Sequence, residues 1–210
     1  LSRYNRNASV RHSEFAWIGD TALAAWGYTD ELSANGTRGF DATDGDFPRH
    51  TTIANNVVRE VGIWEKQSSA WFQAKSMQNT IVDNIFFNGP RAGINYNDGF
   101  GGGNNITGNI LFNYCRDSGD HGPFNSWGRQ MFLIEQPDDG GVPSVYPQFN
   151  TIQRNLMIAN YNSQEGVDND DGSGFFHTHN NVIVYGNMGQ KADMADHDNY
   201  HRENLYAYIG

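Results

Sequence analysis

Thr52-Ile53-Ala54-Asn55-Asn56 is one copy of a short motif in which a β-branched residue, two variable residues and an asparagine follow one another. The copies recur every 25 to 30 residues or so, with one longer interval between Ile106 and Ile152. Clear copies are Thr80-Ile81-Val82-Asp83-Asn84, Asn105-Ile106-Thr107-Gly108-Asn109 and Thr151-Ile152-Gln153-Arg154-Asn155, and weaker ones are Asn181-Val182-Ile183 and Arg202-Glu203-Asn204-Leu205. Each asparagine precedes an apolar pair such as Ile85-Phe86, which is typical of short strands separated by turns.

The repeat predicts an all-β fold, a right-handed parallel β-helix of about six to seven coils. The coils are too short for crossover helices, and leucine-rich or helical repeat patterns are absent. We expect the repeated asparagine to occupy a left-handed turn, where its amide bonds backbone and stacked neighbours. A β-sandwich with coincidental repeats is the alternative.

The whole chain, 1–210, is predicted to be one β-helix domain with insertions near 28–50 and 136–148. Phe15-Ala16-Trp17-Ile18 and Leu23-Ala24-Ala25-Trp26 are expected to be strands of an earlier coil. The residues at both ends of the sequence resemble the middle of a coil, so we interpret the sequence as part of a longer solenoid. Open ends of a solenoid favour self-association.

Composition excludes several classes of partner. The net charge of −10 disfavours nucleic acid but leaves room for a polysaccharide that meets a local basic site or a bound cation. No apolar run is long enough to predict a membrane-spanning helix. The single cysteine, Cys115, has no partner for an internal disulfide. Asn-x-Ser/Thr sequons at Asn7, Asn35 and Asn105 are candidate glycosylation sites and favour an extracellular location.

A second strand in each coil is predicted to display a ligand-binding face. Aligned on their small first residues, the segments are Ala70–Lys75, Gly93–Asp98, Gly122–Trp127 and Gly174–His179. Alternation assigns one set of side chains to the interior: Phe72, Ala74, Asn95, Asn97, Phe124, Ser126, Phe176 and Thr178. The opposite set is predicted to form an outward strip: Gln73, Lys75, Tyr96, Asp98, Asn125, Trp127, His177 and His179. Amides and aromatic rings together suit a sugar, whereas the alternative is a solvated face without a role.

Acidic and histidine-rich loops accompany these strands. Asp168, Asp170 and Asp171 have the aspartate spacing of a calcium loop, and a solvated turn is the alternative. A later cluster, which includes Lys191, Asp193, Asp196, His197, Asp198 and His201, extends the strip or forms a polar surface. The pairs His177-x-His179 and His197-x₃-His201 offer two ligands each to a transition metal, without a third fixed by spacing.

The coils resemble the pectin-lyase-like superfamily of right-handed β-helices, which includes polysaccharide lyases, mannuronan C5-epimerases and glycosidases. Lys75-Ser76, followed by Asn79-Thr80-Ile81, is similar to the Lys-Ser-x-x-Asn stretch of the alginate lyase and chondroitinase B family. That resemblance implies that Lys75 takes the C5 proton of a uronate. The family's catalytic arginine has no counterpart near Tyr96–Asp98, where Arg91 or Tyr96 would have to substitute. Asp120-His121 is faintly similar to the acidic-histidine motif of the epimerases.

The sequence therefore predicts lyase or C5-epimerase chemistry on an extracellular, uronate-containing polysaccharide. Such chemistry needs a base, an acid and a group that neutralises the uronate carboxylate. The predicted catalytic residues are Lys75, Tyr96, His121 and His177, and the predicted substrate-binding residues are Gln73, Arg91, Asp98, Asn125, Trp127, Arg129 and His179. Two alternatives remain: hydrolysis of a neutral substrate by carboxylates such as Asp98 and Asp120, and a non-catalytic glycan-binding or filament-forming β-helix.

Overall fold

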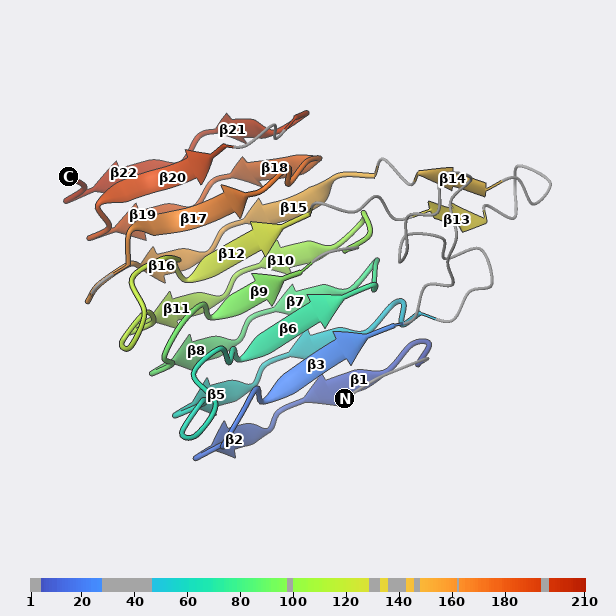
Figure 1. Ribbon diagram of the computed structural model, residues 1–210, viewed down its shortest axis with the longest axis horizontal. Coiled ribbons are helices and arrows are strands. Elements are labelled where there is room, and N and C mark those ends of the chain that lie inside the picture. The colour runs from blue at the N-terminus through green and yellow to red at the C-terminus, as the bar shows by residue number, and fades with distance from the viewer. Residues whose placement is uncertain are drawn as a thin grey trace.

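Three parallel sheets run side by side along the molecule and form a β-helix of about seven coils (Figure 1). The computed structural model describes residues 5–27, 47–97, 100–128, 148–161, 163–193 and 197–210, together with the backbone of two strands at 133–135 and 143–145. Most of the expected insertion at 28–50 and much of the one at 136–148 lie outside these residues. Within the described residues, no helix is long and apolar enough to cross a membrane.

Sheet I is built from the repeated motif. Its strands are β1 (Ser9–Arg11), β4 (Thr52–Ala54), β7 (Thr80–Val82), β10 (Asn105–Thr107), β15 (Asn150–Gln153), β18 (Phe176–His179) and β21 (Tyr200–Arg202). Ile53, Ile81, Ile106 and Ile152 are in register and buried, as the repeat predicts.

Sheet II follows directly after each sheet I strand and its asparagine. Its strands are β2 (Glu14–Ala16), β5 (Val57–Arg59), β8 (Ile85–Phe87), β11 (Ile110–Phe112), β16 (Leu156–Ile158), β19 (Val182–Val184) and β22 (Leu205–Ala207). The middle residue of each central strand points inward, so that Val58, Phe86, Leu111, Met157 and Ile183 stack in the core.

Sheet III closes each coil. Its strands are β3 (Leu23–Trp26), β6 (Trp71–Ala74), β9 (Ile94–Tyr96), β12 (Phe124–Trp127), β17 (Glu165–Asp170) and β20 (Met188–Ala192). Between β12 and β15, the antiparallel pair β13 (Leu133–Glu135) and β14 (Pro143–Val145) projects from the side of the stack (Figure 1).

The assignment of Gly174–His179 to the same sheet as Gly122–Trp127 is wrong. Phe176–His179 is β18 of sheet I, where Thr178 pairs with Ile152 and continues the isoleucine row. Ile183, which we expected to continue that row, lies in sheet II beside Met157. A threonine in place of the isoleucine hides the fifth copy of the motif, because the apolar signature is lost while the fold is kept.

A ladder of buried asparagines joins sheets I and II. The Nδ2 of each donates to the Oδ1 of the next: Asn56 to Asn84, Asn84 to Asn109, Asn109 to Asn155 and Asn155 to Asn181, each at 3.0 Å, and Asn181 to Asn204 at 2.9 Å. Each Oδ1 also accepts a backbone N–H from the coil before, as Asn84 does from Asn56 at 2.9 Å. The predicted stacking is therefore confirmed. The expected left-handed backbone is found one residue earlier, at positions such as Asn55, Asp83 and Arg154.

A second asparagine row lies at the turn between sheets III and I. Asn79 and Asn104 are buried, and their Oδ1 atoms accept backbone N–H groups from Thr51 and Asn79 at 3.1 and 2.9 Å. Asn104 in turn donates from Nδ2 to the Oδ1 of Asn150 at 2.7 Å. Two corners of each coil are thus held by amides, which leaves sheet III as the face free to vary in chemistry.

We expect Asn84→Ala to lower the free energy of unfolding by about 3 kcal/mol, because it removes several buried hydrogen bonds and leaves their partners unsatisfied. Chemical denaturation followed by circular dichroism measures the change. Asn204→Ala is the control: this asparagine accepts the same two bonds and donates to a backbone carbonyl as Asn84 does, but it is partly exposed, so water can replace these bonds. Equal losses in the two variants would contradict the structural role of the buried ladder.

Candidate functional site on the outer face of sheet III

The outer face of sheet III changes in chemistry from one end of the stack to the other. Parallel pairing places outward side chains in two rows that run along the stack. The first row is Ala24, Phe72, Asn95, Asn125, Asp168 and Lys191, and the second is Trp26, Ala74, Asn97, Trp127, Asp170 and Asp193. Aromatic rings therefore come first, amides follow, and charged groups come last.

The aromatic and amide part of this face is connected. Trp26 and Phe72 pack with ring centroids 5.4 Å apart, and Trp26 is half-exposed. Further along, Asn125 donates to the Oδ1 of Asn95 at 2.5 Å. The Oδ1 of Asn97 accepts from Asn95 at 2.7 Å and from the Trp127 indole. These bonds hold the indole and the amides in fixed positions, as recognition of a hydroxyl-rich ligand requires.

Lys191 is the centre of the charged end. Its Nζ lies 3.4 Å from Asp168 Oδ1, 3.2 Å from Asp170 Oδ1 and 3.7 Å from Asp193 Oδ2. The Lys191 side chain is 19% exposed and that of Asp193 is 44% exposed, whereas that of Asp168 is fully buried. A ligand on this face therefore reaches Lys191, Asp170 and Asp193 first, with Asp168 behind them.

His121 lies behind the same cluster. Its Nδ1 is 3.3 Å from Asp168 Oδ2, and its backbone carbonyl accepts a hydrogen bond from the Cys115 thiol at 2.9 Å. Within the described part of the chain, the buried Nε of Arg91 and the buried Oε2 of Glu165 have no hydrogen-bond partner. The charged end thus combines paired groups with unused hydrogen-bonding capacity.

Burial shifts the pKa values of the two inner titratable groups, Asp168 and His121, in opposite directions. It raises the pKa of Asp168 to about 8, with Lys191 opposing the shift. It lowers the pKa of His121 to about 4, assisted by the positive charge of Arg91. At neutral pH the carboxyl is therefore largely protonated and the imidazole is neutral, so their contact is a hydrogen bond between uncharged groups.

The pKa values of the two accessible carboxyls, Asp170 and Asp193, are also shifted in opposite directions. Burial tends to raise the pKa of Asp170, but hydrogen bonds with Asp193 and Lys191 outweigh it and lower that pKa. Burial and the hydrogen bond with Asp170 raise the pKa of Asp193. Burial opposes the charge of Lys191, yet its three aspartates outweigh burial and raise its pKa. Two carboxyls whose pKa values are shifted in opposite directions and one ammonium accordingly meet at one place, which is the composition of an acid–base site.

The structure places the predicted residues of the first two coils differently from our alignment. Phe124 pairs with Ile94, which in turn pairs with Trp71, so β12 is shifted by one residue from the expected register. Gln73 and Tyr96 are consequently fully buried in the core, so the prediction that they face outward is wrong. The Tyr96 hydroxyl has no partner among the described residues, and burial raises its pKa far above the usual value. Asn95 and Asn97, expected inside, lie on the outer face instead.

The third coil follows the prediction. Asn125 and Trp127 lie on the strand face opposite to the buried Phe124 and Ser126; Trp127 is partly exposed, whereas Asn125 is 2% exposed and so is itself buried. The true next neighbours of this strand are Asp168 and Asp170 of β17, which we assigned to a loop. Gly166, a small residue at the start of β17, could have revealed this strand, as Gly93 and Gly122 revealed the earlier ones.

Other predicted residues lie elsewhere or are not described. His177 and His179 stand on sheet I, with rings 4.6 Å apart, away from the outer face of sheet III. Lys75 follows β6 in a left-handed turn, and β9 and β12 lie between β6 and β17. Of the sequons, Asn7 is exposed and Asn105 is partly buried in β10. Asp98, Arg129, Asn35 and Asp196 lie outside the described residues.

The aspartates proposed as calcium ligands hold a side-chain cation instead. Asp168 and Asp170 flank the Lys191 ammonium, and Asp171 is the next residue, in a left-handed turn. In the described ranges, no group of three or more histidines, cysteines or acidic residues is arranged to hold a metal ion. This arrangement does not fit a calcium ion, and a calcium site here stays a prediction from sequence alone.

Comparisons with protein-family models, curated proteins and solved structures find no match for this chain. The chemistry of the outer face must therefore be argued from its own residues.

We expect Asp168→Asn to change how stability depends on pH. The raised pKa of Asp168 means that its folded form is favoured when protonated, so this contribution is complete below about pH 4 and is lost as pH rises towards about 8. Between these pH values the free energy of unfolding of the variant should therefore rise relative to that of the wild type. Chemical denaturation at a series of pH values measures this difference. Asp83→Asn, at an exposed turn, is the control and should run parallel to the wild type. Parallel curves for Asp168→Asn would contradict the raised pKa.

Proposed function

We propose that the chain is a carbohydrate-active enzyme that binds a uronate-containing polysaccharide along the outer face of sheet III and acts on it at Asp170, Asp193 and Lys191. The observation that carries the proposal is geometric: Lys191 Nζ lies 3.2 Å from Asp170 Oδ1 and 3.7 Å from Asp193 Oδ2, so two accessible carboxyls share one ammonium, and their pKa values are shifted in opposite directions. Opposed shifts of this kind distinguish a base from an acid within one site.

Sugar binding is supported by the middle of the face. The Trp127 indole offers a flat apolar surface, and the neighbouring amides of Asn95 and Asn97, held from behind by the buried Asn125, offer donors and acceptors at fixed positions. The rows continue over several coils towards Trp26 and Phe72, so the surface is elongated along the stack. An extended polymer suits such a surface better than a small compact ligand does.

Lyase or epimerase chemistry assigns a role to each group at the charged end. Asp170, ionised, takes the C5 proton of the uronate, while Lys191 stabilises the charge that develops on the uronate carboxylate. In a lyase the C4–O4 bond then breaks, a C4–C5 double bond forms, and O4 takes the proton of Asp193. The hydrogen bond between the two carboxyls returns the proton from Asp170 to Asp193. In an epimerase no C–O bond breaks: a water on the opposite side gives a proton to C5, and Asp170 then releases the proton that it took to the resulting hydroxide through solvent.

The buried residues behind this set are assigned a positioning role. Asp168 contacts Lys191 and His121 together, and so fixes the ammonium relative to the strand. Arg91 lowers the pKa of His121 through its positive charge, and binding of the uronate by Arg91 stays a prediction from the sequence because its Nε is buried. Lys75, the base implied by the resemblance to alginate lyases, remains an alternative base. Membership of the pectin-lyase-like superfamily and an extracellular location are part of the same proposal.

Hydrolysis is the second candidate, because two neighbouring carboxyls, one with a raised and one with a lowered pKa, are also the acid–base pair of glycosidases. The two reactions leave different products. Elimination gives an unsaturated sugar with ultraviolet absorbance, whereas hydrolysis gives reducing ends without it, and epimerisation gives neither but alters the sugar composition.

We expect Asp170→Asn to lower turnover by roughly 10² to 10⁴-fold, since it removes the base from the site. The assay is a screen of alginate, pectin and glycosaminoglycans with ultraviolet absorbance, reducing-end and composition readouts. His177→Ala, on sheet I, is the control and should leave turnover unchanged, and Lys75→Ala tests the alternative base. Turnover that survives Asp170→Asn would overturn the assignment. Binding without turnover on every polymer would favour a non-catalytic glycan-binding protein.

A further inference from the structure

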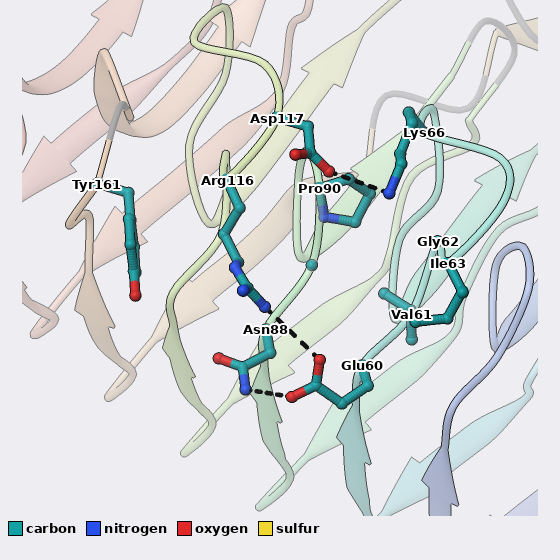
Figure 2. A pocket seen from close by; sticks show the side chains of 11 residues that line it. Glu60, Val61, Gly62, Ile63, Lys66, Asn88, Pro90, Arg116, Asp117 and Tyr161 are labelled. Atoms are coloured by element: carbon teal, nitrogen blue, oxygen red, sulfur yellow. Dashed lines mark hydrogen bonds and ion pairs between the residues drawn. The ribbon is translucent and has the colours of Figure 1, made fainter.

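A cavity lies away from the outer face of sheet III, among the connections that lead from sheet II to sheet III (Figure 2). The connection 88–93 is shorter than the connections 60–70 and 113–123 in the coils on either side. The short one therefore forms a floor between two higher walls. The resulting cavity has a volume of about 460 Å³, within the range of small-molecule sites.

The floor is held firmly by its walls. The carbonyl of Pro90 accepts backbone N–H groups from Asp117 and Ser118 at 3.0 and 3.2 Å. On the other side, Gly62 has a φ of +67°, and a Cβ on it would lie 2.5 Å from the Pro90 ring. Only glycine allows this close approach of the first wall. A cavity fixed in this way is already formed without ligand. Binding therefore costs little conformational entropy of the chain.

The charges that line the cavity compensate one another. Arg116 Nη1 lies 3.6 Å from Glu60 Oε2, and Lys66 Nζ lies 3.2 Å from Asp117 Oδ2. Glu60 Oε1 also accepts from Asn88 Nδ2 at 2.5 Å. Two cations and two anions leave no net charge for an ionic ligand to neutralise. Partly exposed pairs of this kind are weak, so their outer donors and acceptors are available to hydroxyl groups.

An aromatic ring completes the lining. Tyr161 is 67% exposed and, in Figure 2, lies on the opposite side of the group from Lys66. Its ring and the Pro90 ring provide apolar surfaces, while Arg116, Glu60 and Asn88 provide hydrogen-bonding groups. Apolar rings combined with balanced polar groups match a sugar ring, which has apolar faces and a rim of hydroxyls.

We propose that this cavity is a separate binding site for an uncharged sugar residue. The site uses none of the residues assigned to catalysis, and its occupation does not depend on the proposed reaction. Its ligand class also differs from the uronate proposed for sheet III, because its lining carries no surplus positive charge.

Saturation-transfer NMR with methyl β-D-glucoside and methyl α-D-mannoside tests the proposal, with glucuronate and glucosamine as charged probes. We expect transfer to at least one neutral glycoside, and a loss of at least five-fold in affinity with Tyr161→Ala. Tyr185→Ala is the matched control, because Tyr185 is an exposed tyrosine with the same left-handed backbone after the equivalent sheet II strand, outside the cavity.

Arg116→Ala provides an independent arm, since it leaves Glu60 without its cation and should shift preference towards glucosamine. Asp170→Asn should leave glycoside binding unchanged, which separates this site from the proposed catalytic one. The proposal is overturned if neither neutral glycoside binds the wild type, or if Tyr161→Ala and Tyr185→Ala behave alike.

Discussion

The buried asparagine ladder is the interaction on which the rest of the structure depends. Each amide bonds the amide of the next coil and the backbone of the coil before, so two coils can pair in only one register. In a parallel stack a slip by one residue would move every inward side chain to the outside. Breaking a buried amide chain costs several hydrogen bonds at once. The ladder therefore fixes register more strictly than apolar packing, which tolerates sliding between similar side chains.

That strictness is what permits sheet III to carry polar groups on both of its faces. Inside, Gln73 accepts from the Trp71 indole at 3.0 Å, and Ser126 accepts from Asn169 at 3.0 Å. Outside, Asp168 is brought beside Lys191 because β17 and β20 are paired in a fixed register. Sheet III thus contributes little sequence signal of its own and takes its alignment from the two amide-held corners. The candidate site is assembled on the one sheet whose side chains are least constrained by the core.

The difference between sheets I and III explains which parts of the structure could be predicted from the sequence. The sheet I motif predicted the β-helix and the isoleucine row, because each copy pairs a conspicuous apolar residue with an asparagine. On sheet III the inner face contains Gln73, Tyr96 and Ser126, so alternation between polar and apolar residues does not reveal which side is buried. The alignment on small residues is therefore wrong by one residue between β9 and β12, and it assigns Asp168 and Asp170 to a loop. Lys191 and Asp193 were singled out as a possible extension of the strip, but their contact with β17 depends on pairing across coils.

The charged end also bears on the choice between an enzyme and a structural solenoid. A fully buried carboxyl whose pKa is raised to about 8 opposes folding at neutral and alkaline pH, and Glu165 is likewise buried with a raised pKa. A filament or coat subunit gains nothing from such groups, because an apolar or amide side chain at the same place would be more stable. Local violations of favourable packing concentrate where chemistry is performed. The cost of burying Asp168 beneath Lys191 is therefore an argument for the proposed catalytic function of the outer face of sheet III rather than for the architectural alternative.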